Sequence, residues 1–366
     1  MAVNDMASLV ELDSVEILVI VDNEVTLSQL DPISPCPNEV VQQTGGLKEI
    51  GIFGTDITDR GEAKKELRMD SICCGAHGLA LLITGIAGDR RHTILFDTGP
   101  EEAVFEHNAK RLKAPLGDIE AIQLSHWHRD HSGGMLRVLS MANAARESGA
   151  APISVDLHPA RPDYRGVMAM APVSLEADPT FEEIEFAGGK VEKHDEAHVV
   201  LDSFFMVSGE IPRTTEYEKG LRRGIRYSKA TGKWESDEQM QDERSLMCKL
   251  KGGRWNFALT ALMYADWPGG TGKGLVMFTG CSHAGVVNAS RHALDLSTAP
   301  LYAVMGGYHM ADGEPQFIEQ TVTDLKALDP QILLTGHCTG WRAKFEIQSQ
   351  MPGRIVPSFV GSKFVL

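Results

Sequence analysis

The 366-residue chain has little cysteine, and none of it occurs in the CxxC spacing of compact metal or redox motifs. The six cysteines are scattered through the chain, at positions 36, 73, 74, 248, 281 and 338. Small secreted proteins that depend on disulfides use closely spaced cysteines, so this pattern favours a reducing compartment. We therefore expect a cytoplasmic protein.

The chain also lacks an excess of basic residues and any long hydrophobic run. It has 35 Lys and Arg against 50 Asp and Glu, a formal net charge of -15. Nucleic acids and anionic membranes attract basic surfaces, so we expect neither as a partner. The first apolar run, residues 15–21, is too short to span a bilayer, and it follows acidic residues rather than the basic stretch of a secretory signal.

The clearest chemical signal is the stretch of residues 125–134, in which His126, His128, Asp130 and His131 lie within six positions. Imidazole and carboxylate groups are the ligands that zinc-like ions prefer. In an extended segment His126 and His128 project to the same side. Asp130 and His131 follow too closely to serve the same tetrahedral ion comfortably. The alternative is a polar surface loop, but the pattern favours two neighbouring metal ions.

The surroundings of this stretch support a site. Residues 119–124 predict a strand and residues 135–147 a helix, which places the cluster on a loop at the carboxyl end of a strand. Residues 15–21 predict another strand, which ends at the pair Asp22 and Asn23. That pair is as typical of a simple turn as of a functional site.

Later apolar strands end in a similar way. Three of them are followed by glycine and then, within three residues, by histidine: His283, His309 and His337. A single histidine after a strand usually has no function, but three indicate strand ends that converge. Cys281 lies two residues before His283. By contrast, His194 and His198 lie in a polar stretch and are typical of surface residues.

In these motifs the sequence resembles the metallo-β-lactamase superfamily. The resemblance rests on Asp97-Thr98-Gly99, the His126-x-His128-x-Asp130-His131 motif and the late histidines. It implies an α+β fold, an αββα sandwich of two mixed β-sheets packed face to face with helices outside. We expect a single domain over residues 1–366, with loop insertions near 26–68, 216–244 and 252–274.

Shorter motifs narrow the resemblance to one branch: VDN, HGL, GEIPR, GCSHAG, GGYH and GHCTG. They are similar to the dihydropterin-ribofuranosyl-aminobenzene phosphate synthase-like branch, which includes lactamases that open cyclic amides and carbamates. The resemblance implies one zinc ion on His126, His128 and a third ligand, and a second zinc ion on Asp130, His131 and His337. It also implies that Asp97 orients a ligand histidine.

The third ligand of the first ion is open. In the superfamily a middle histidine lies in a GHT-like turn and a bridging aspartate follows a later strand. The corresponding positions here are Gly209-Glu210-Ile211 and Gly280-Cys281. We expect His283 to be the third ligand, with Glu210 and Cys281 as alternatives, since a thiolate also suits zinc.

The activity implied by the resemblance is that of a metal-dependent hydrolase. A zinc-bound hydroxide would open a small cyclic amide, carbamate or lactone, with iron or manganese as other candidate metals. Asp130, Tyr308 and His309 are expected to take part in catalysis, and His77 and Arg213 to position the substrate. The partner is a small molecule, and a homodimer is left open.

Two other functions compete. A synthase acting on a phosphate-bearing substrate would need basic residues, and the visible candidates are Arg213, Arg222, Arg223 and Arg342. The other is a non-hydrolytic metal or redox protein of the flavodiiron type. It is disfavoured because no GxGxxG segment or flavodoxin module follows.

Overall fold

The computed structural model describes residues 9–25, 41–44, 55–66, 68, 72–252, 273–297 and 299–366. Most of its strands belong to two eight-stranded sheets. The first sheet has the order β12 (Gly189–Lys193), β9 (Ile153–Leu157), β8 (Ile119–Gln123), β7 (Arg90–Phe96), β6 (Ala80–Ala87), β2 (Ser14–Val21), β22 (Ser362–Val365) and β3 (Val41–Thr44). It is mixed, because β7, β8, β9 and β12 pair in parallel while β2, β6 and β22 pair antiparallel.

The second sheet is mixed as well. Its order is β13 (His198–Val200), β14 (Phe205–Val207), β17 (Leu246–Leu250), β18 (Gly274–Thr279), β19 (Leu301–Gly306), β20 (Ile332–Thr335) and β21 (Ile355–Pro357), with β1 (Glu11–Leu12) paired to β17. The strands from β18 to β21 run parallel, so their carboxyl ends lie at one edge. The three late histidines follow these strands.

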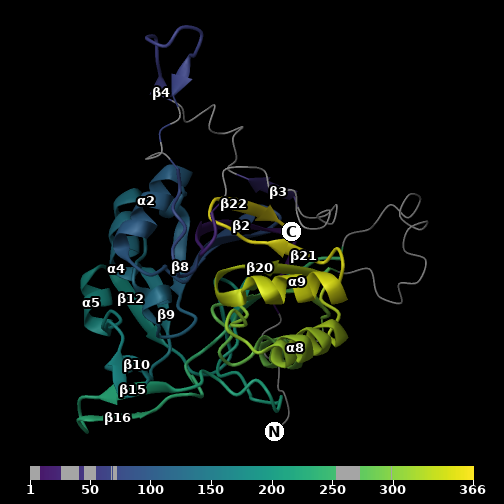
Figure 1. Cartoon of the computed structure of the whole chain (residues 1–366). Coiled ribbons are helices and arrows are strands. Elements are labelled where there is room, and N and C mark those ends of the chain that lie inside the picture. Colours follow the sequence, from purple (N-terminus) through teal and green to yellow (C-terminus); the bar gives the residue numbers. More distant parts are fainter. Residues whose placement is uncertain are drawn as a thin grey trace, which may run out of the picture.

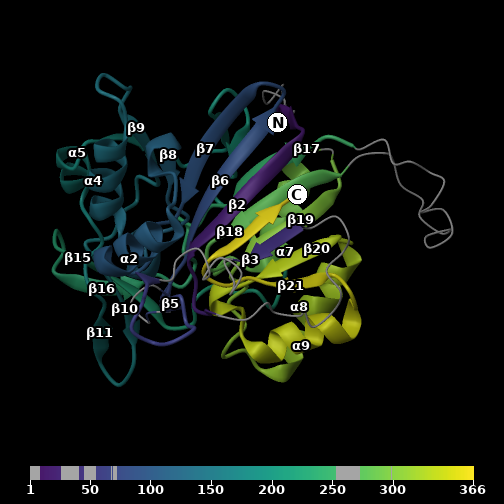
Figure 2. The same cartoon turned by 90° about the horizontal axis from the view of Figure 1, so that it is seen from above.

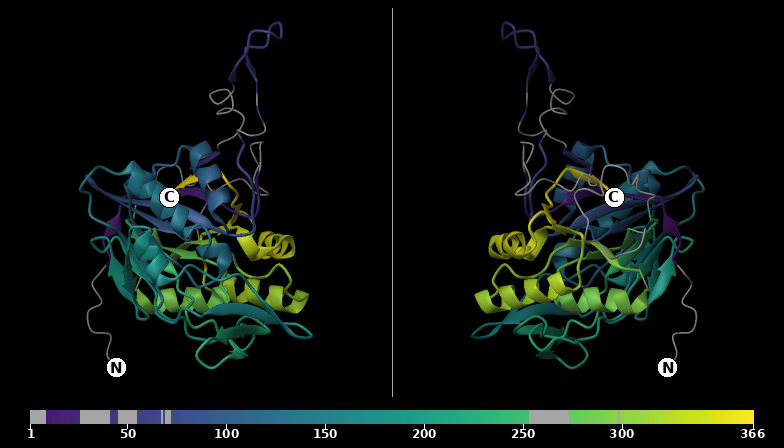
Figure 3. Two further views of the ribbon diagram at one scale, coloured as in Figure 1. Left: turned by 90° about the vertical axis from the view of Figure 1, so that its left-hand side faces the viewer. Right: turned by 90° about the vertical axis from the view of Figure 1, so that its right-hand side faces the viewer.

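Helices cover the outer face of each sheet (Figures 1 and 2). The first group is α2 (Glu102–Leu112), α4 (Met135–Ala145) and α5 (Phe181–Phe186), and the second is α7 (Val286–Leu296), α8 (Pro315–Ala327) and α9 (Trp341–Gln350). Figure 3 shows the same arrangement from two sides, with the C-terminal helices in green and yellow. The αββα sandwich expected from the sequence is confirmed.

Three apolar layers hold the sandwich together. The central layer lies between the sheets, where Phe96 of β7 and Phe278 of β18 are both fully buried with ring centroids 6.4 Å apart. Each outer layer joins one sheet to its helices, as Phe105 of α2 and Val322 of α8 illustrate. Strand β2 illustrates why a continuous apolar run predicts a strand in this fold: its β-branched side chains are buried on both faces along its second half.

The insertion predicted at residues 216–244 is only partly a loop. It contains β15 (Gly224–Ser228) and β16 (Lys233–Ser236), which form a separate four-stranded sheet with β10 (Tyr164–Met168) and β11 (Pro172–Ser174). The prediction was wrong here because the pairing partner of β15 is β10, which lies about 60 residues earlier in the chain.

The other two predicted insertions lie mainly outside the described residues. Of residues 26–68, the described parts include strand β3 and the short hairpin of β4 (Thr55–Asp56) and β5 (Lys65–Glu66), so this stretch is not uniformly loop. Of residues 252–274, only the two ends are described. No helix among the described residues is long and apolar enough to cross a membrane.

Candidate metal centre

The His-rich stretch forms a tight loop between β8 and α4. His126 lies in a bend that the His128 amide closes on the His126 carbonyl oxygen at 3.0 Å, and the one-turn helix α3 (Arg129–Ser132) carries Asp130 and His131. Two glycines let this loop pack closely. A Cβ atom at Gly133 would lie 1.8 Å from the carbonyl oxygen of Pro100, and one at Gly134 would lie 2.2 Å from that of Thr98. Only glycine fits both positions, so the loop is held against the turn that follows β7.

His126, His128 and His283 form a first group of candidate ligands. His128 Nδ1 lies 3.0 Å from His126 Nε2 and 3.1 Å from His283 Nε2. All three side chains are buried. Burial, reinforced by neighbouring imidazoles, lowers the pKa of His126 and His283 well below the ordinary value, and burial together with Arg165 lowers the pKa of His128 to about 3. The three rings are therefore neutral at pH 7, the form that binds a metal ion.

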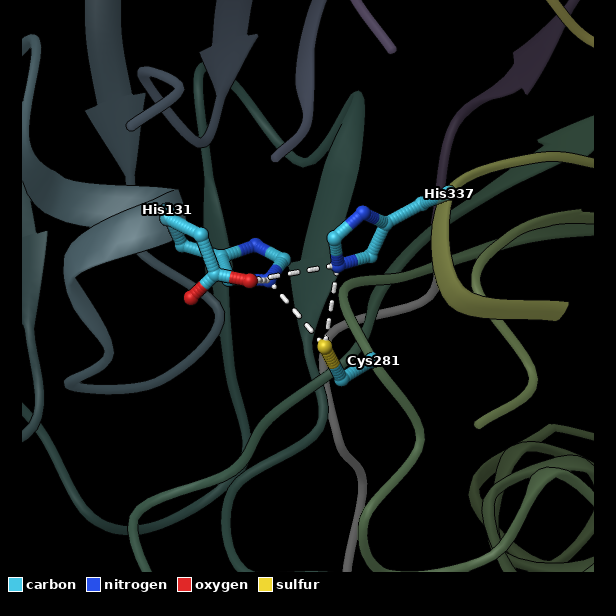
Figure 4. Close-up of side chains that lie close together, drawn as sticks. His131, Cys281 and His337 are labelled. Atoms are coloured by element: carbon cyan, nitrogen blue, oxygen red, sulfur yellow. Dashed lines mark hydrogen bonds and ion pairs between the residues drawn. The ribbon is translucent and has the colours of Figure 1, made fainter. Parts of the chain in front are cut away.

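A second group of candidate ligands comprises Asp130, His131, Cys281 and His337. Cys281 Sγ lies 3.2 Å from His131 Nε2 and 3.1 Å from His337 Nε2, and Asp130 Oδ2 lies 3.5 and 3.4 Å from the same nitrogens. Figure 4 shows His131, Cys281 and His337 pointing toward one another from three different segments. The Cys281 sulfur also lies within 4.8 Å of a ring nitrogen of His126 and of His283, so it lies between the two groups.

The outer nitrogens of three of these histidines are also fixed. His131 Nδ1 is 2.6 Å from Asp97 Oδ2, His337 Nδ1 is 2.9 Å from Asn23 Oδ1, and His126 Nδ1 is 2.9 Å from the hydroxyl of Ser125. Such contacts orient the ring and leave the other nitrogen free for a metal ion. The residues therefore fit a bound metal by donor type and by orientation.

The second group differs from the first in its charge. Burial lowers the pKa of His131, but the carboxylates of Asp130 and Asp97 more than offset it and leave the pKa raised. The pKa of Asp130 is well below its ordinary value, because His131 and His337 outweigh the effect of burial. The two shifts describe a buried ion pair, in which the Asp130 carboxylate and the neighbouring imidazoles stabilise each other's charged forms; a bound cation would take the place of the imidazole protons.

Asp22 and Asn23 at the end of β2 both bond to His337. This strand end is therefore more than a simple turn. Asp22 is fully buried and accepts a hydrogen bond from the backbone amide of His337 at 2.8 Å. Asn23 joins two histidines, since its amide group also contacts His77 Nδ1 at 3.1 Å. This strand tip supports the loop that carries His337.

The predicted substrate and catalytic residues lie in different environments. His77 lies at the rim, where its 70% exposed side chain places Nε2 3.4 Å from Asp130 Oδ2. The ring of His309 is centred 4.4 Å from that of His283. Glu210 and Arg213 lie apart from both groups: the Glu210 side chain is exposed, and Arg213 donates to the carbonyl oxygens of Ile211 and Gln239.

Tyr308 does not fit the role expected of it. Its hydroxyl donates to the carbonyl oxygen of Val304 at 3.0 Å, and its ring is 2% exposed within the layer between β19 and the outer helices. The side chain therefore points into the core and away from the ligand groups. An oxyanion donor at this strand end would have to be His309.

A third group of potential ligands comprises Asp156, His194 and His198. Asp156 Oδ2 is 2.8 Å from His194 Nδ1 and 2.6 Å from His198 Nε2, while Arg244 contacts the other oxygen at 2.5 Å. These are hydrogen-bond distances, and the guanidinium already balances the carboxylate. The group is an ion-pair network behind the His-rich loop, and the two histidines are only partly exposed.

Comparison with known proteins agrees with this architecture. Residues 77–202 match the metallo-beta-lactamase superfamily. The chain is 28% identical over 281 residues to 7,8-dihydropterin-6-methyl-4-(beta-D-ribofuranosyl)-aminobenzene-5'-phosphate synthase of Methanocaldococcus jannaschii, covering 73% of this chain and 82% of that protein. It is 26% identical over 269 residues to an uncharacterized protein of the same archaeon, covering 73% of this chain and 85% of that one.

Among solved structures, a metal-dependent hydrolase of the beta-lactamase superfamily superposes with a TM-score of 0.62 at 20% identity. The match covers 95% of this chain and 98% of that protein, so it extends the shared fold well beyond residues 77–202. We conclude that the chain contains a metallo-beta-lactamase superfamily domain and has the metallo-beta-lactamase fold.

Proposed function

We propose that the protein is a metal-dependent hydrolase that uses two metal ions to open a small cyclic amide, carbamate or lactone. The observation that carries the proposal is the pair of candidate ligand groups with Cys281 between them: its sulfur belongs to the second group and also lies within 4.8 Å of the ring nitrogens of His126 and His283. Members of the first group are neutral histidines, and the second group adds a carboxylate, a combination that suits zinc-like ions. Two adjacent metal ions serve several classes of hydrolase, among them phosphatases and aminopeptidases.

The first ion would be held by His126, His128 and His283, and the second by Asp130, His131 and His337, with the Cys281 sulfur in reach of both. Bound divalent ions would supply Lewis acidity and an activated water molecule at neutral pH. We assign Cys281 to the position that a bridging aspartate takes in the superfamily, because its sulfur faces both groups. The thiol is 3% exposed, which protects it from solvent.

The surrounding side chains would orient the ligands and the substrate. Asp97 and Asn23 hold the Nδ1 atoms of His131 and His337, so the Nε2 atoms face the centre. His77 and His309 are the candidates to bind substrate, because each lies beside a ligand group and neither belongs to one. Their ring N–H groups can donate a hydrogen bond to a carbonyl oxygen.

A synthase acting on a phosphate-bearing substrate is the second candidate. The relative at 28% identity, which is named as such a synthase, favours it. Against it, the guanidinium of Arg213 is engaged by two backbone carbonyl groups and faces Glu243, Glu210 and Glu218. A phosphate group placed there would meet acidic side chains, which disfavours binding.

Metal content and substrate range test both candidates. Protein purified without chelator should contain about two zinc ions per chain, as a two-metal site requires. His128→Ala should lose metal and hydrolysis together, whereas His292→Ala, a partly buried histidine that contacts the carbonyl oxygen of Ser208, should lose neither. Metal-reconstituted protein is then screened against lactams, cyclic carbamates, lactones and phosphoesters.

The outcomes separate the candidates. Turnover of a cyclic amide, carbamate or lactone supports the hydrolase. Turnover confined to phosphate-bearing compounds supports the synthase-like alternative. Protein that binds no zinc, iron or manganese rejects both, because each depends on the same ligand groups.

A further inference from the structure

We propose that three consecutive residues, Asp242, Glu243 and Arg244, position the two metal-binding loops relative to each other before metal binds. We call them the 242–244 segment. The inference rests on the proposed metal-dependent function and assigns positioning residues to it. The segment lies just before β17, in a stretch whose sequence predicts only a charged insertion, and all three side chains are buried.

Glu243 holds the loop that carries Cys281 and His283. Its Oε1 accepts the backbone amide of His283 at 2.8 Å, and its Oε2 accepts that of Ala284 at 2.5 Å. The side chain is 1% exposed. A buried carboxylate is costly unless it is well hydrogen-bonded, so the fold keeps this group only with its two amide donors in place. The contact fixes the backbone that directs the His283 ring.

Asp242 and Arg244 hold the loop that carries His126 and His128. Asp242 Oδ2 accepts the amide of Trp127 at 2.7 Å, and Trp127 lies between the two histidines. The Arg244 backbone amide donates to the carbonyl oxygen of Ser125 at 2.8 Å, and its guanidinium donates to that of Leu124 at 3.0 Å. The same guanidinium is anchored by Asp156.

The segment reaches both loops because its side chains diverge where a turn ends. The Glu243 amide donates to the Met240 carbonyl oxygen at 3.0 Å, so Asp242 lies in the turn, and Arg244 lies in the chain that leads into β17. Here the outer two, Asp242 and Arg244, contact residues 124–127, and Glu243 contacts residues 283–284. These two loops follow β8 and β18, which belong to different sheets. The segment therefore fixes the separation between the two halves of the first ligand group.

Arg165 completes the support from the far side. Its guanidinium donates to the Trp127 carbonyl oxygen at 2.7 Å and pairs with both Asp242 and Asp237. The peptide groups on both sides of Trp127 are thus held by one ion-paired unit. Residues that orient ligands in this way affect metal affinity by about 10- to 100-fold when they are replaced.

The chain offers a matched control for Glu243. Glu218 is also buried, and its carboxylate likewise accepts two successive backbone amides, those of Val287 and Asn288, each at 2.9 Å. These amides begin α7 and belong to neither ligand group. Glu243→Gln and Glu218→Gln therefore make the same substitution in similar settings, but only the first disturbs the backbone of a ligand residue.

The test measures the Zn²⁺ dissociation constant of full-length protein by competition with a chromogenic chelator at pH 7.5, together with the melting temperature of the metal-free protein. We expect Glu243→Gln to raise the dissociation constant by about 10- to 100-fold, and Glu218→Gln to leave it unchanged. Asp242→Asn should act like Glu243→Gln. The proposal is overturned if the constant of Glu243→Gln matches that of the wild type, even where its melting temperature falls.

If the variants fail to fold, the proposal can still be tested on the wild-type protein. In metal-free wild type, the backbone amides of Trp127, His283 and Ala284 should exchange with solvent as slowly as amides of the central strands. Fast exchange of these amides would mean that the loops are not held before metal binds, and it would overturn the proposal. If the wild type binds no Zn²⁺ at all, the proposed function fails instead, which is a different result.

Discussion

Replacing Asp97 with Asn should weaken metal binding far more than it weakens the fold. Asp97 Oδ2 accepts from His131 Nδ1 at 2.6 Å and from the Ser125 hydroxyl at 2.8 Å, and its Oδ1 accepts the Ser125 amide at 2.7 Å. The carboxylate thus accepts all three hydrogen bonds, whereas the amide of Asn has only one acceptor oxygen and turns an N–H₂ group toward one of the donors. The His131 ring then loses its fixed orientation.

The magnitude follows from the role of such contacts. Loss of a group that orients a ligand histidine costs about 10- to 100-fold in metal affinity, or about 1.4 to 2.7 kcal/mol. We expect the Zn²⁺ dissociation constant of Asp97→Asn to rise within this range, measured by chelator competition. The melting temperature of the metal-free variant, recorded in parallel, separates loss of affinity from loss of folded protein.

Asp178→Asn is a suitable control. Asp178 is buried near the same loop, but it contacts the hydroxyl of Ser132 and no ring nitrogen, and burial raises its pKa. An amide at this position should leave metal affinity unchanged. If Asp97→Asn binds Zn²⁺ as tightly as the control does, the view that Asp97 orients a ligand histidine is refuted.

Other predictions concern the fold and its pH dependence. Phe278→Ala should lower the free energy of unfolding by about 3 to 5 kcal/mol in urea titrations, since the ring is fully buried between the sheets. Gly134→Ala should lower both stability and zinc content, because its Cβ would lie 2.2 Å from the Thr98 carbonyl oxygen; equal zinc content would contradict this. Burial raises the pKa of Glu218 from 4.5 to about 7, so its contribution to stability is fully present below pH 4.5 and is lost as the pH rises through 7. Glu218→Gln should therefore gain about 1 to 3 kcal/mol relative to wild type between pH 4.5 and pH 8 in chemical denaturation of the metal-free protein, and a constant difference would contradict the shift.

Local sequence signals predicted much of the fold and the candidate site. Apolar runs such as residues 15–21 mark strands because a strand buried on both faces needs continuous hydrophobic sequence. The motif from His126 to His131 lies on its loop, and the late histidines His283 and His337 lie beside it, because parallel strands bring their carboxyl ends to one edge.

The errors have physical reasons. Tyr308 and His309 both follow the end of β19, after two glycines. Their position in the sequence does not determine which way each side chain points. In the structure the Tyr308 ring packs into the apolar core. Strands β15 and β16 are rich in charge and pair with distant β10, so local pattern hides them. Glu243 escaped prediction for a similar reason, since its partners lie 40 residues away in sequence.

The route by which the centre forms has a consequence for synthesis of the protein in the cell. Its parts come from Asn23 near one end of the chain, from the loop after β8, from Cys281 and from His337, and β22 pairs with β2. Contacts between such distant segments form slowly, because long stretches of chain must be closed into loops first. Most of the chain must be translated before the two ligand groups can come together. Nascent chains should therefore acquire metal only after His337 has been translated, and the apolar strands made earlier are open to aggregation until then.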